Sequence, residues 1–190
     1  MGKIGVIDYS CGNITSLVSA LRKLGGDCIV SSKVSELGDC AKLILPGVGA
    51  FPHAMRMLKQ QNLIEFLQES ARKELPILGI CLGMQILFES SDEFGPCDGL
   101  GILRGHVKKL PDEWPTIPNI GWWGLEINDT ENRFSLTKDD TFYFVHSFFC
   151  NPINVDNQIN IAIDNIEICA MVQHKAITAV QFHPEKSQKS

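Results

Sequence analysis

The sequence predicts an α/β fold, with a mostly parallel central sheet, helices on both faces and additional antiparallel strands in the C-terminal half. Over the first 90 or so residues, short apolar runs alternate with stretches of helical apolar spacing, a pattern typical of a parallel sheet. After Ser91 the helical spacing stops, and short apolar runs separated by Pro, Gly, Asn and Asp follow. That change favours antiparallel strands. Between the two parts, an apolar strand leads directly into a helical pattern at Cys81.

Each N-terminal element follows from its own pattern. Residues 4–7 are an apolar run ending at Asp8, and helical spacing then continues over 14–24 until Gly25 and Gly26 end the helix. Further strands are expected at 28–30, 42–45 and 77–80, and helices at 54–60, 64–72 and from 82 onward, where Leu82, Ile86 and Phe88 continue the apolar spacing.

The C-terminal strands are bounded by turn residues, with a hairpin turn expected at Asp164-Asn165 and another at 173–175. We expect these strands to extend one edge of the sheet. No repeat, low-complexity segment or linker interrupts the chain, so residues 1–190 are expected to form a single domain. The expected strands are residues 102–103, 107–110, 125–127, 141–145, 159–163, 166–172 and 177–182.

Composition narrows the class of protein. The chain is 44% hydrophobic and 21% charged, as in ordinary globular proteins, and its net charge of −5 gives no reason to expect nucleic-acid binding. No apolar run reaches the ~20 residues that span a membrane, and the early Asp8 does not fit a secretory signal. We therefore expect a cytoplasmic protein without membrane contact. Seven cysteines, no two within five residues, predict neither a local metal site nor a disulfide framework. No cofactor is expected.

Cys81 lies in Gly79-Ile80-Cys81-Leu82-Gly83, the cysteine counterpart of the Gly-x-Ser-x-Gly nucleophile elbow. On so sharp a strand-to-helix turn, side chains at the two glycine positions would collide with the helix and the adjoining strand. The turn would also place the sulfur at a helix N-terminus, which favours thiolate over thiol. The alternative interpretation is a buried structural cysteine between two packing glycines.

A cysteine nucleophile needs a histidine partner and a group that orients it. His183 follows an apolar strand and opens His183-Pro184-Glu185. Proline favours extended geometry at the residue before it, and residues i and i+2 of an extended chain point the same way. The Glu185 carboxylate can therefore lie behind the His183 ring. The alternative is a solvated turn at the end of a strand. Of the other histidines, His53, His106 and His174 lie among polar residues, and His146 ends an apolar strand without an acidic neighbour.

Together, Gly79–Gln85 and Phe182-His183-Pro184-Glu185-Lys186-Ser187, 102 residues apart from Cys81 to His183, resemble the class I (triad) glutamine amidotransferases. Three more stretches resemble the HisH family, the glutaminase subunits of imidazole glycerol phosphate synthase. They are residues 7–13, 45–51 and 118–122, and 143–148 fits too. The resemblance covers nearly the whole chain and implies a class I glutamine amidotransferase-like fold.

The resemblance implies roles for individual residues. Cys81 would attack the glutamine side-chain amide, His183 would transfer protons, and Glu185 would orient His183. The oxyanion hole would use the Leu82 N–H and the loop containing Val48 and Gly49, in which paired glycines allow a peptide to rotate. Taken alone, that loop could be a plain strand-ending turn, and Ser147 a strand-end hydroxyl. The implied glutamine contacts are Gly49, Gln85 and Ser147, and the implied interface residues are Tyr143, Lys186, Trp122 and Trp123.

The implied partner is a HisF-like (β/α)₈ barrel, which would form a heterodimer with this chain and receive its ammonia. Two features depart from the family. The family usually has Gly-Trp-Asn where this chain has Gly121-Trp122-Trp123, which admits a HisH-like paralogue that supplies ammonia for amidation of a surface-polysaccharide sugar. The family also continues past this motif with an apolar helix, where this sequence ends at Ser190, so we expect part of the sheet to lack that cover. Two further alternatives are a cysteine hydrolase or chaperone-like protein on a similar fold, and a degenerate scaffolding subunit.

Overall fold

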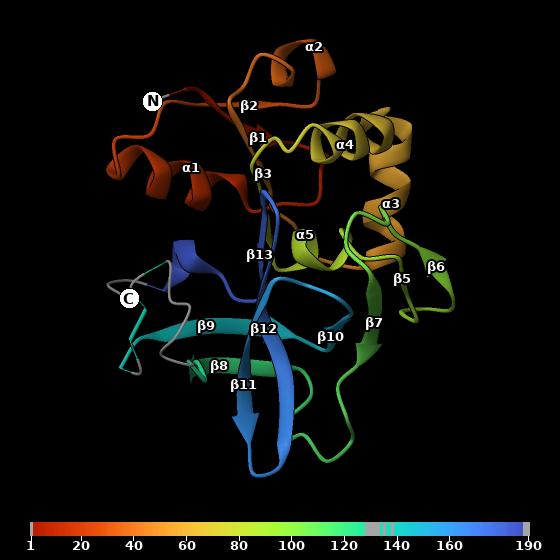
Figure 1. Cartoon of the computed structure of the whole chain (residues 1–190), viewed down its shortest axis with the longest axis vertical. Coiled ribbons are helices and arrows are strands. Elements are labelled where there is room, and N and C mark those ends of the chain that lie inside the picture. The colour runs from red at the N-terminus through yellow and green to blue at the C-terminus, as the bar shows by residue number, and fades with distance from the viewer. Residues whose placement is uncertain (1, 128–133, 135, 138, 188–190) are drawn as a thin grey trace.

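A seven-stranded sheet forms the centre of the computed structural model, which describes residues 2–127, 134, 136–137 and 139–187 (Figure 1). Its order is β11-β12-β13-β4-β3-β1-β2. The parallel strands are β1 (Ile4–Ile7), β2 (Cys28–Ser31), β3 (Lys42–Leu45), β4 (Ile77–Ile80) and β13 (Ile177–Val180). Beyond β13, the last of the parallel strands, β12 (Ile166–His174) and β11 (Asn157–Ile163) continue the sheet in antiparallel pairing. The predicted fold class is confirmed.

Helices cover both faces of this sheet, as the sequence predicts. The strands alternate their side chains, so Val6 and Ile44 pack with Leu17 of α1 (Ile14–Lys23), whereas Ile7 and Leu43 belong to the cluster on the other face. That second cluster includes buried residues of α3 (Phe51–Gln60) and α4 (Leu63–Arg72), and Leu37 of α2 (Val34–Leu37). The sheet is thus buried on both sides, which explains why its strands are nearly continuous apolar runs.

Two smaller sheets complete the C-terminal half. One has the order β10-β7-β5-β6 and the other pairs β8 with β9. We expected the C-terminal strands to extend one edge of the main sheet, but only β11, β12 and β13 do so. The strands of the smaller sheets are β5 (Ser90–Ser91), β6 (Cys97–Asp98), β7 (Gly105–Lys109), β8 (Asn119–Gly124), β9 (Thr141–His146) and β10 (Phe148–Pro152).

The helix expected from residue 82 is only one turn long, α5 (Leu82–Gln85). Ile86 and Phe88 are fully buried, as their spacing suggests, but the Ile86 carbonyl accepts a hydrogen bond from the Leu100 N–H at 2.8 Å. The N–H groups of Ile102 and Leu103 likewise donate to the Leu87 carbonyl. These long-range bonds replace the helical ladder, and they also explain why residues 102–103 are not a strand.

Other differences are local. Residues 125–127 make an isolated bridge, between Glu126 and Asn160, instead of a strand. The turn at Asp164-Asn165 is present, with Asp164 at φ 53°, while the second turn begins two residues later than expected, at Lys175 with φ 51°. Within the described part of the chain, no helix combines the length and the apolar character needed to cross a membrane.

Candidate active site

Cys81 forms a strained turn between β4 and α5. Its backbone has φ 54° and ψ −112°, a conformation that L-residues adopt only where the surroundings enforce it. Its N–H donates to the Val180 carbonyl of the adjacent β13 at 2.8 Å, and its carbonyl accepts from the N–H of Met84 at 3.0 Å. The strand on one side and the helical turn on the other therefore hold the residue in place.

The two flanking glycines are required by space. A Cβ at Gly79 would lie 2.7 Å from Leu87 Cδ1 and 2.9 Å from the Gly83 carbonyl oxygen. A Cβ at Gly83 would overlap the Leu45 carbonyl oxygen of the neighbouring strand β3. The predicted collisions with the helix and with the adjoining strand are both confirmed. The Gly-x-Cys-x-Gly pattern is thus a consequence of the turn's geometry.

β13 pairs in parallel with β4, so the C-terminal ends of the two strands lie side by side. Cys81 follows β4, and His183 and Glu185 follow β13. His183 has extended backbone, φ −105° and ψ 92°, and Glu185 lies in the short 3₁₀ turn η1 (Pro184–Lys186). The distance from Glu185 Oε1 to His183 Nδ1 is 2.8 Å, and the two side chains are 5% and 2% exposed. The predicted arrangement of carboxylate behind imidazole is present, and the pair is buried instead of solvated.

The surroundings of His183 favour its protonated form. Burial by itself lowers the pKa of this histidine, but the Cys81 sulfur and the Glu185 carboxylate more than offset that effect and raise the pKa to about 9. His183 Nε2 is buried, and because Nδ1 is bound to Glu185, Nε2 is the nitrogen on which the Cys81 sulfur acts. The ring nitrogen opposite the carboxylate is thus free to exchange a proton near the sulfur.

A cavity of about 360 Å³ opens above Cys81, within the range of small-molecule sites. All three residues expected to contact glutamine line this cavity: Gly49, Gln85 and Ser147. The Ser147 hydroxyl belongs to the short connection between β9 and β10. The remaining lining residues are Val48, Leu82, Glu93, Pro118, Val145, His146 and Phe148. The cavity therefore lies between the nucleophile turn and the 46–51 loop.

Two of the three predicted oxyanion donors are occupied by other acceptors. The Leu82 N–H donates to the Gly47 carbonyl oxygen at 3.3 Å, and the Val48 N–H donates to the Cys11 carbonyl oxygen at 2.6 Å. Both bonds belong to the single peptide unit that joins Gly47 to Val48. Gly49 has φ +105° and open space around its Cβ position. The predicted oxyanion donors Leu82 and Val48 are therefore not available to a ligand in this conformation.

Sequence reasoning missed Glu93 and underrated His146. Glu93 follows β5, and its Oε2 accepts the Phe51 N–H at 2.7 Å, which places a carboxylate in the cavity wall. Nothing in the local sequence singles it out. His146 is 6% exposed, and burial lowers its pKa to about 4. Its Nδ1 donates to the Phe148 carbonyl at 2.9 Å, and its Nε2 accepts from Asn119 Nδ2 at 3.0 Å. The sequence signal for this neutral ring is a histidine at the end of an apolar strand. Its partner Asn119 begins the neighbouring strand β8, and only the fold brings the two together.

Three of the four predicted interface residues lie together on one face. Lys186 Nζ lies 5.6 Å from the centre of the Tyr143 ring, and the rings of Trp122 and Tyr143 are 5.8 Å apart. Trp122 is 48% exposed. Trp123 alternates to the other side of β8, where its ring packs 5.6 Å from that of Trp114. Its position corresponds to packing within the fold and does not support the predicted interface role.

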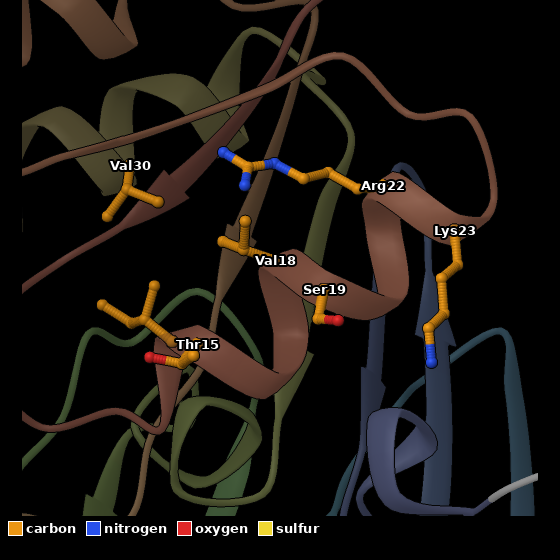
Figure 2. A pocket seen from close by; sticks show the side chains of 7 residues that line it. Thr15, Val18, Ser19, Arg22, Lys23 and Val30 are labelled. Carbon is orange, nitrogen blue, oxygen red and sulfur yellow. The ribbon is translucent and has the colours of Figure 1, made fainter.

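Another hollow lies between α1 and β2, where it shares no residue with the cavity above Cys81 (Figure 2). It has a volume of about 600 Å³. Figure 2 shows Arg22 reaching over Val18 toward Val30, while Lys23 points away. Its lining contains no cysteine, histidine or carboxylate, so Cys81 remains the candidate nucleophile.

A cysteine elbow on a parallel sheet, with a buried His-Glu pair on the next strand, defines the glutamine amidotransferases of class I. The family model described as "Glutamine amidotransferase class-I" matches residues 5–190. The structure of PurLQS from Thermotoga maritima has the same fold, with a TM-score of 0.71 and 20% identity over 98% of this chain and 89% of that one.

Two curated relatives make the assignment finer. Both are "Imidazole glycerol phosphate synthase subunit HisH", from Exiguobacterium sibiricum and Geobacillus thermodenitrificans. The first is 45% identical, covering 97% of this chain and 88% of the relative, and the second is 40% identical, covering 98% and 90%. The chain belongs to the class-I glutamine amidotransferases and, within them, to the HisH family.

Proposed function

We propose that this chain is the glutaminase subunit of an imidazole glycerol phosphate synthase. It hydrolyses L-glutamine and passes the ammonia to a HisF-like barrel subunit, which uses it to make imidazole glycerol phosphate in histidine biosynthesis. The observation that carries the proposal is the meeting of Cys81 with the His183–Glu185 pair beside a cavity large enough for an amino acid. The two curated relatives support the acceptor pathway.

In the first half of the reaction, the Cys81 sulfur attacks the side-chain carbonyl carbon of glutamine. The C–N bond breaks as His183 Nε2 gives its proton to the departing nitrogen, which leaves as ammonia, and a γ-glutamyl thioester remains on Cys81. The Glu185 carboxylate holds Nδ1–H at 2.8 Å and so directs the other nitrogen toward the reacting atoms. The raised pKa of His183 means that the ring carries the required proton at neutral pH.

In the second half, water attacks the thioester carbon and gives its proton to His183 Nε2. The C–S bond breaks, glutamate leaves and His183 is again protonated beside the sulfur. Both halves pass through a tetrahedral oxyanion, whose stabilisation by N–H donors is a large part of catalysis in acyl transfer. In the present conformation, the Leu82 donor is occupied by Gly47.

Rotation of one peptide unit would assemble the missing hole. If the Gly47–Val48 peptide turned by about half a revolution, its oxygen would leave the Leu82 N–H and its own N–H would leave Cys11. Only glycine fits at position 47, because a Cβ there would overlap the Tyr9 hydroxyl and lie 2.9 Å from the Gly83 nitrogen. On this proposal, the present conformation is the resting one, and glutamine is hydrolysed only after the peptide has rotated.

The face that carries Tyr143, Trp122 and Lys186 is the proposed docking surface for the barrel subunit. Ile120, on the same side of β8 as Trp122, is 58% exposed and adds apolar area. Trp123 was the residue that favoured the polysaccharide paralogue. Because it packs on Trp114, its departure from the family pattern changes the interior more than this outer face.

The test is glutaminase activity with and without partner. We expect weak hydrolysis by the isolated chain and a strong rise when a HisF subunit and its acceptor ligand are added, with the ammonia recovered in the imidazole product. Affinity purification with mass-spectrometric identification of the bound protein names the partner independently. High turnover that ignores the partner, or co-purification with a sugar-modifying enzyme in place of a HisF subunit, would refute the proposal.

A further inference from the structure

Gln181 is a second side chain in contact with the nucleophile. It follows β13, two residues before His183, and is completely buried. Its Nε2 lies 3.7 Å from the Cys81 sulfur, within hydrogen-bonding range of a sulfur acceptor. Its backbone N–H donates to the Ala170 carbonyl at 2.8 Å, which fixes the start of the side chain. A buried amide of this kind must find partners for both of its ends.

One backbone carbonyl decides which end of Gln181 faces the sulfur. The Phe148 carbonyl can only accept, so the Gln85 atom 2.9 Å from it must be the amide nitrogen. The same nitrogen lies 3.0 Å from Gln181, which must therefore present its oxygen to Gln85. The NH₂ end of Gln181 is left to point at Cys81. The Phe148 carbonyl, by fixing Gln85 as the donor to Gln181, thus also fixes Gln181 as the donor to the sulfur.

The Phe148 carbonyl is itself held. It accepts the Nδ1–H of His146, whose Nε2 in turn accepts from Asn119. Because the His146 ring stays neutral until about pH 4, this anchor keeps its direction through the physiological range. Gln85 spends both of its N–H groups inside the protein, so only its Oε1 remains to serve a ligand in the cavity.

We propose that Gln181, oriented by Gln85, donates a hydrogen bond that stabilises the Cys81 thiolate and aims the sulfur into the cavity. It is a catalytic group of the glutaminase reaction, and it acts alongside His183. The inference rests on the proposed function for the role of Cys81 as nucleophile. His183 supplies a charge that depends on its protonation, whereas Gln181 supplies a neutral donor that is present at every pH.

Within the described residues, the titratable groups that interact electrostatically with Cys81 are His183, Tyr9 and Cys150. Burial raises the pKa of Tyr9 and of Cys150 well above their usual ranges, so both stay neutral at working pH. A change in the titration of Cys81 on replacing Gln181 would therefore report the amide donor, provided that His183 is intact.

The experiment is the pH dependence of Cys81 alkylation by iodoacetamide, measured by mass spectrometry of the Cys81 peptide in the isolated subunit. Gln181→Leu should move the pH of half-maximal rate upward by about one unit, which is about tenfold slower alkylation below that midpoint. Gln181→Glu keeps the acceptor for Gln85 and places an oxygen against the sulfur, so it should move the midpoint at least as far. Gln85→Met, which frees the amide to turn, should shift it less.

Gln68→Leu is the matched control. Gln68 on α4 also donates a partly buried hydrogen bond, to the Leu100 carbonyl at 2.8 Å, and its loss should leave the Cys81 midpoint unchanged. A folded Gln181→Leu or Gln181→Glu protein with the wild-type midpoint would overturn the inference, and if the leucine variant does not fold, the size-matched glutamate variant decides. Because neither glutamine nor partner is used, a shifted midpoint in a chain that never hydrolyses glutamine would refute the proposed function and the catalytic role of Gln181, and would leave only its hydrogen bond to the Cys81 thiolate standing.

Discussion

The backbone N–H of Leu82, directly after the nucleophile, donates to the carbonyl oxygen of Gly47, 3.3 Å away. The N–H group that is expected to stabilise the reaction's oxyanion is therefore bound to a backbone carbonyl of the protein instead. The same Gly47–Val48 peptide sends its N–H to Cys11. On the proposed mechanism, these two hydrogen bonds to one peptide hold the subunit at rest, and a partner would need to shift the equilibrium by about a few kcal/mol to release it.

Tyr9 should be part of that constraint. Its buried hydroxyl donates to the Pro46 carbonyl at 2.7 Å, next to the peptide that must rotate. Tyr9→Phe removes this donor and should lower the free energy of unfolding by about 1–2 kcal/mol. If about 1 kcal/mol of that loss falls on the resting loop, basal glutaminase activity rises about fivefold, while the partner-stimulated rate changes little. Steady-state glutamate release with and without partner measures the ratio; an unchanged ratio in a destabilised protein would show that Tyr9 does not restrain the loop.

Cys81→Ala should separate the two halves of the synthase reaction. Without the sulfur, glutamine-dependent synthesis should fall by about a thousandfold or more. Synthesis by the complex from added ammonium salts at high pH should persist, because the partner then needs no glutaminase. Both rates are read from product formation in the reconstituted complex. Loss of both would assign Cys81 a structural role.

The His183–Glu185 pair predicts how stability changes in alkaline solution. The folded-state pKa of His183, about 9, lies above the ordinary value of 6.5. Its contribution is therefore fully present below about pH 6.5 and is lost as the pH rises through 9, by up to about 3 kcal/mol. Glu185→Gln removes one of the two groups that raise the pKa and should flatten this decline. Urea unfolding between pH 6 and 10 tests it, and parallel declines for the two proteins would exclude the carboxylate as a cause.

His146 predicts the opposite slope in acid. Burial lowers its folded-state pKa to about 4, so the unfolded chain binds a proton below about pH 6.5 that the folded chain refuses until pH 4. Stability should fall over this window by about 3 kcal/mol. His146→Gln should be less stable at pH 8, because Asn119 and Phe148 lose partners, yet should lose less stability on acidification. Equilibrium unfolding at pH 8, 6 and 4.5 supplies the comparison, and an identical acid slope in the variant would contradict the neutral, buried ring.

Trp122 and Trp123 should differ in what they support. Trp123→Asn removes the ring that packs on Trp114 and should cost about 2 kcal/mol of stability, with partner affinity little changed. Trp122→Ala, on the exposed side of β8, should leave stability within about 0.5 kcal/mol and weaken the complex about tenfold. Thermal unfolding and titration calorimetry with the barrel subunit distinguish the two. The reverse pattern would place Trp123 at the interface and Trp122 in the fold.

The sequence by itself determined the features that depend on neighbouring residues. Apolar runs and helical spacing placed the parallel strands, because burial on both faces leaves a continuous apolar signature. The elbow could be inferred because a Cβ at Gly79 or Gly83 has no room. The alignment of Glu185 behind His183 followed from extended geometry across a proline, and the structure has the two side chains 2.8 Å apart.

Only the tertiary structure decided the contacts between distant residues. Gln181 and Cys81 are 100 positions apart and meet because β13 and β4 pair; Glu93 reaches Phe51 across 42 positions. Contacts between distant residues also decide that the Leu82 and Val48 N–H groups are bound to backbone carbonyls and that the Trp123 ring packs on Trp114. The short α5 also belongs here, since residues 100–103 supply the hydrogen bonds that replace its second turn. Local patterns specify which elements form, but a hydrogen bond's direction and a side chain's exposure depend on which surface folding brings opposite.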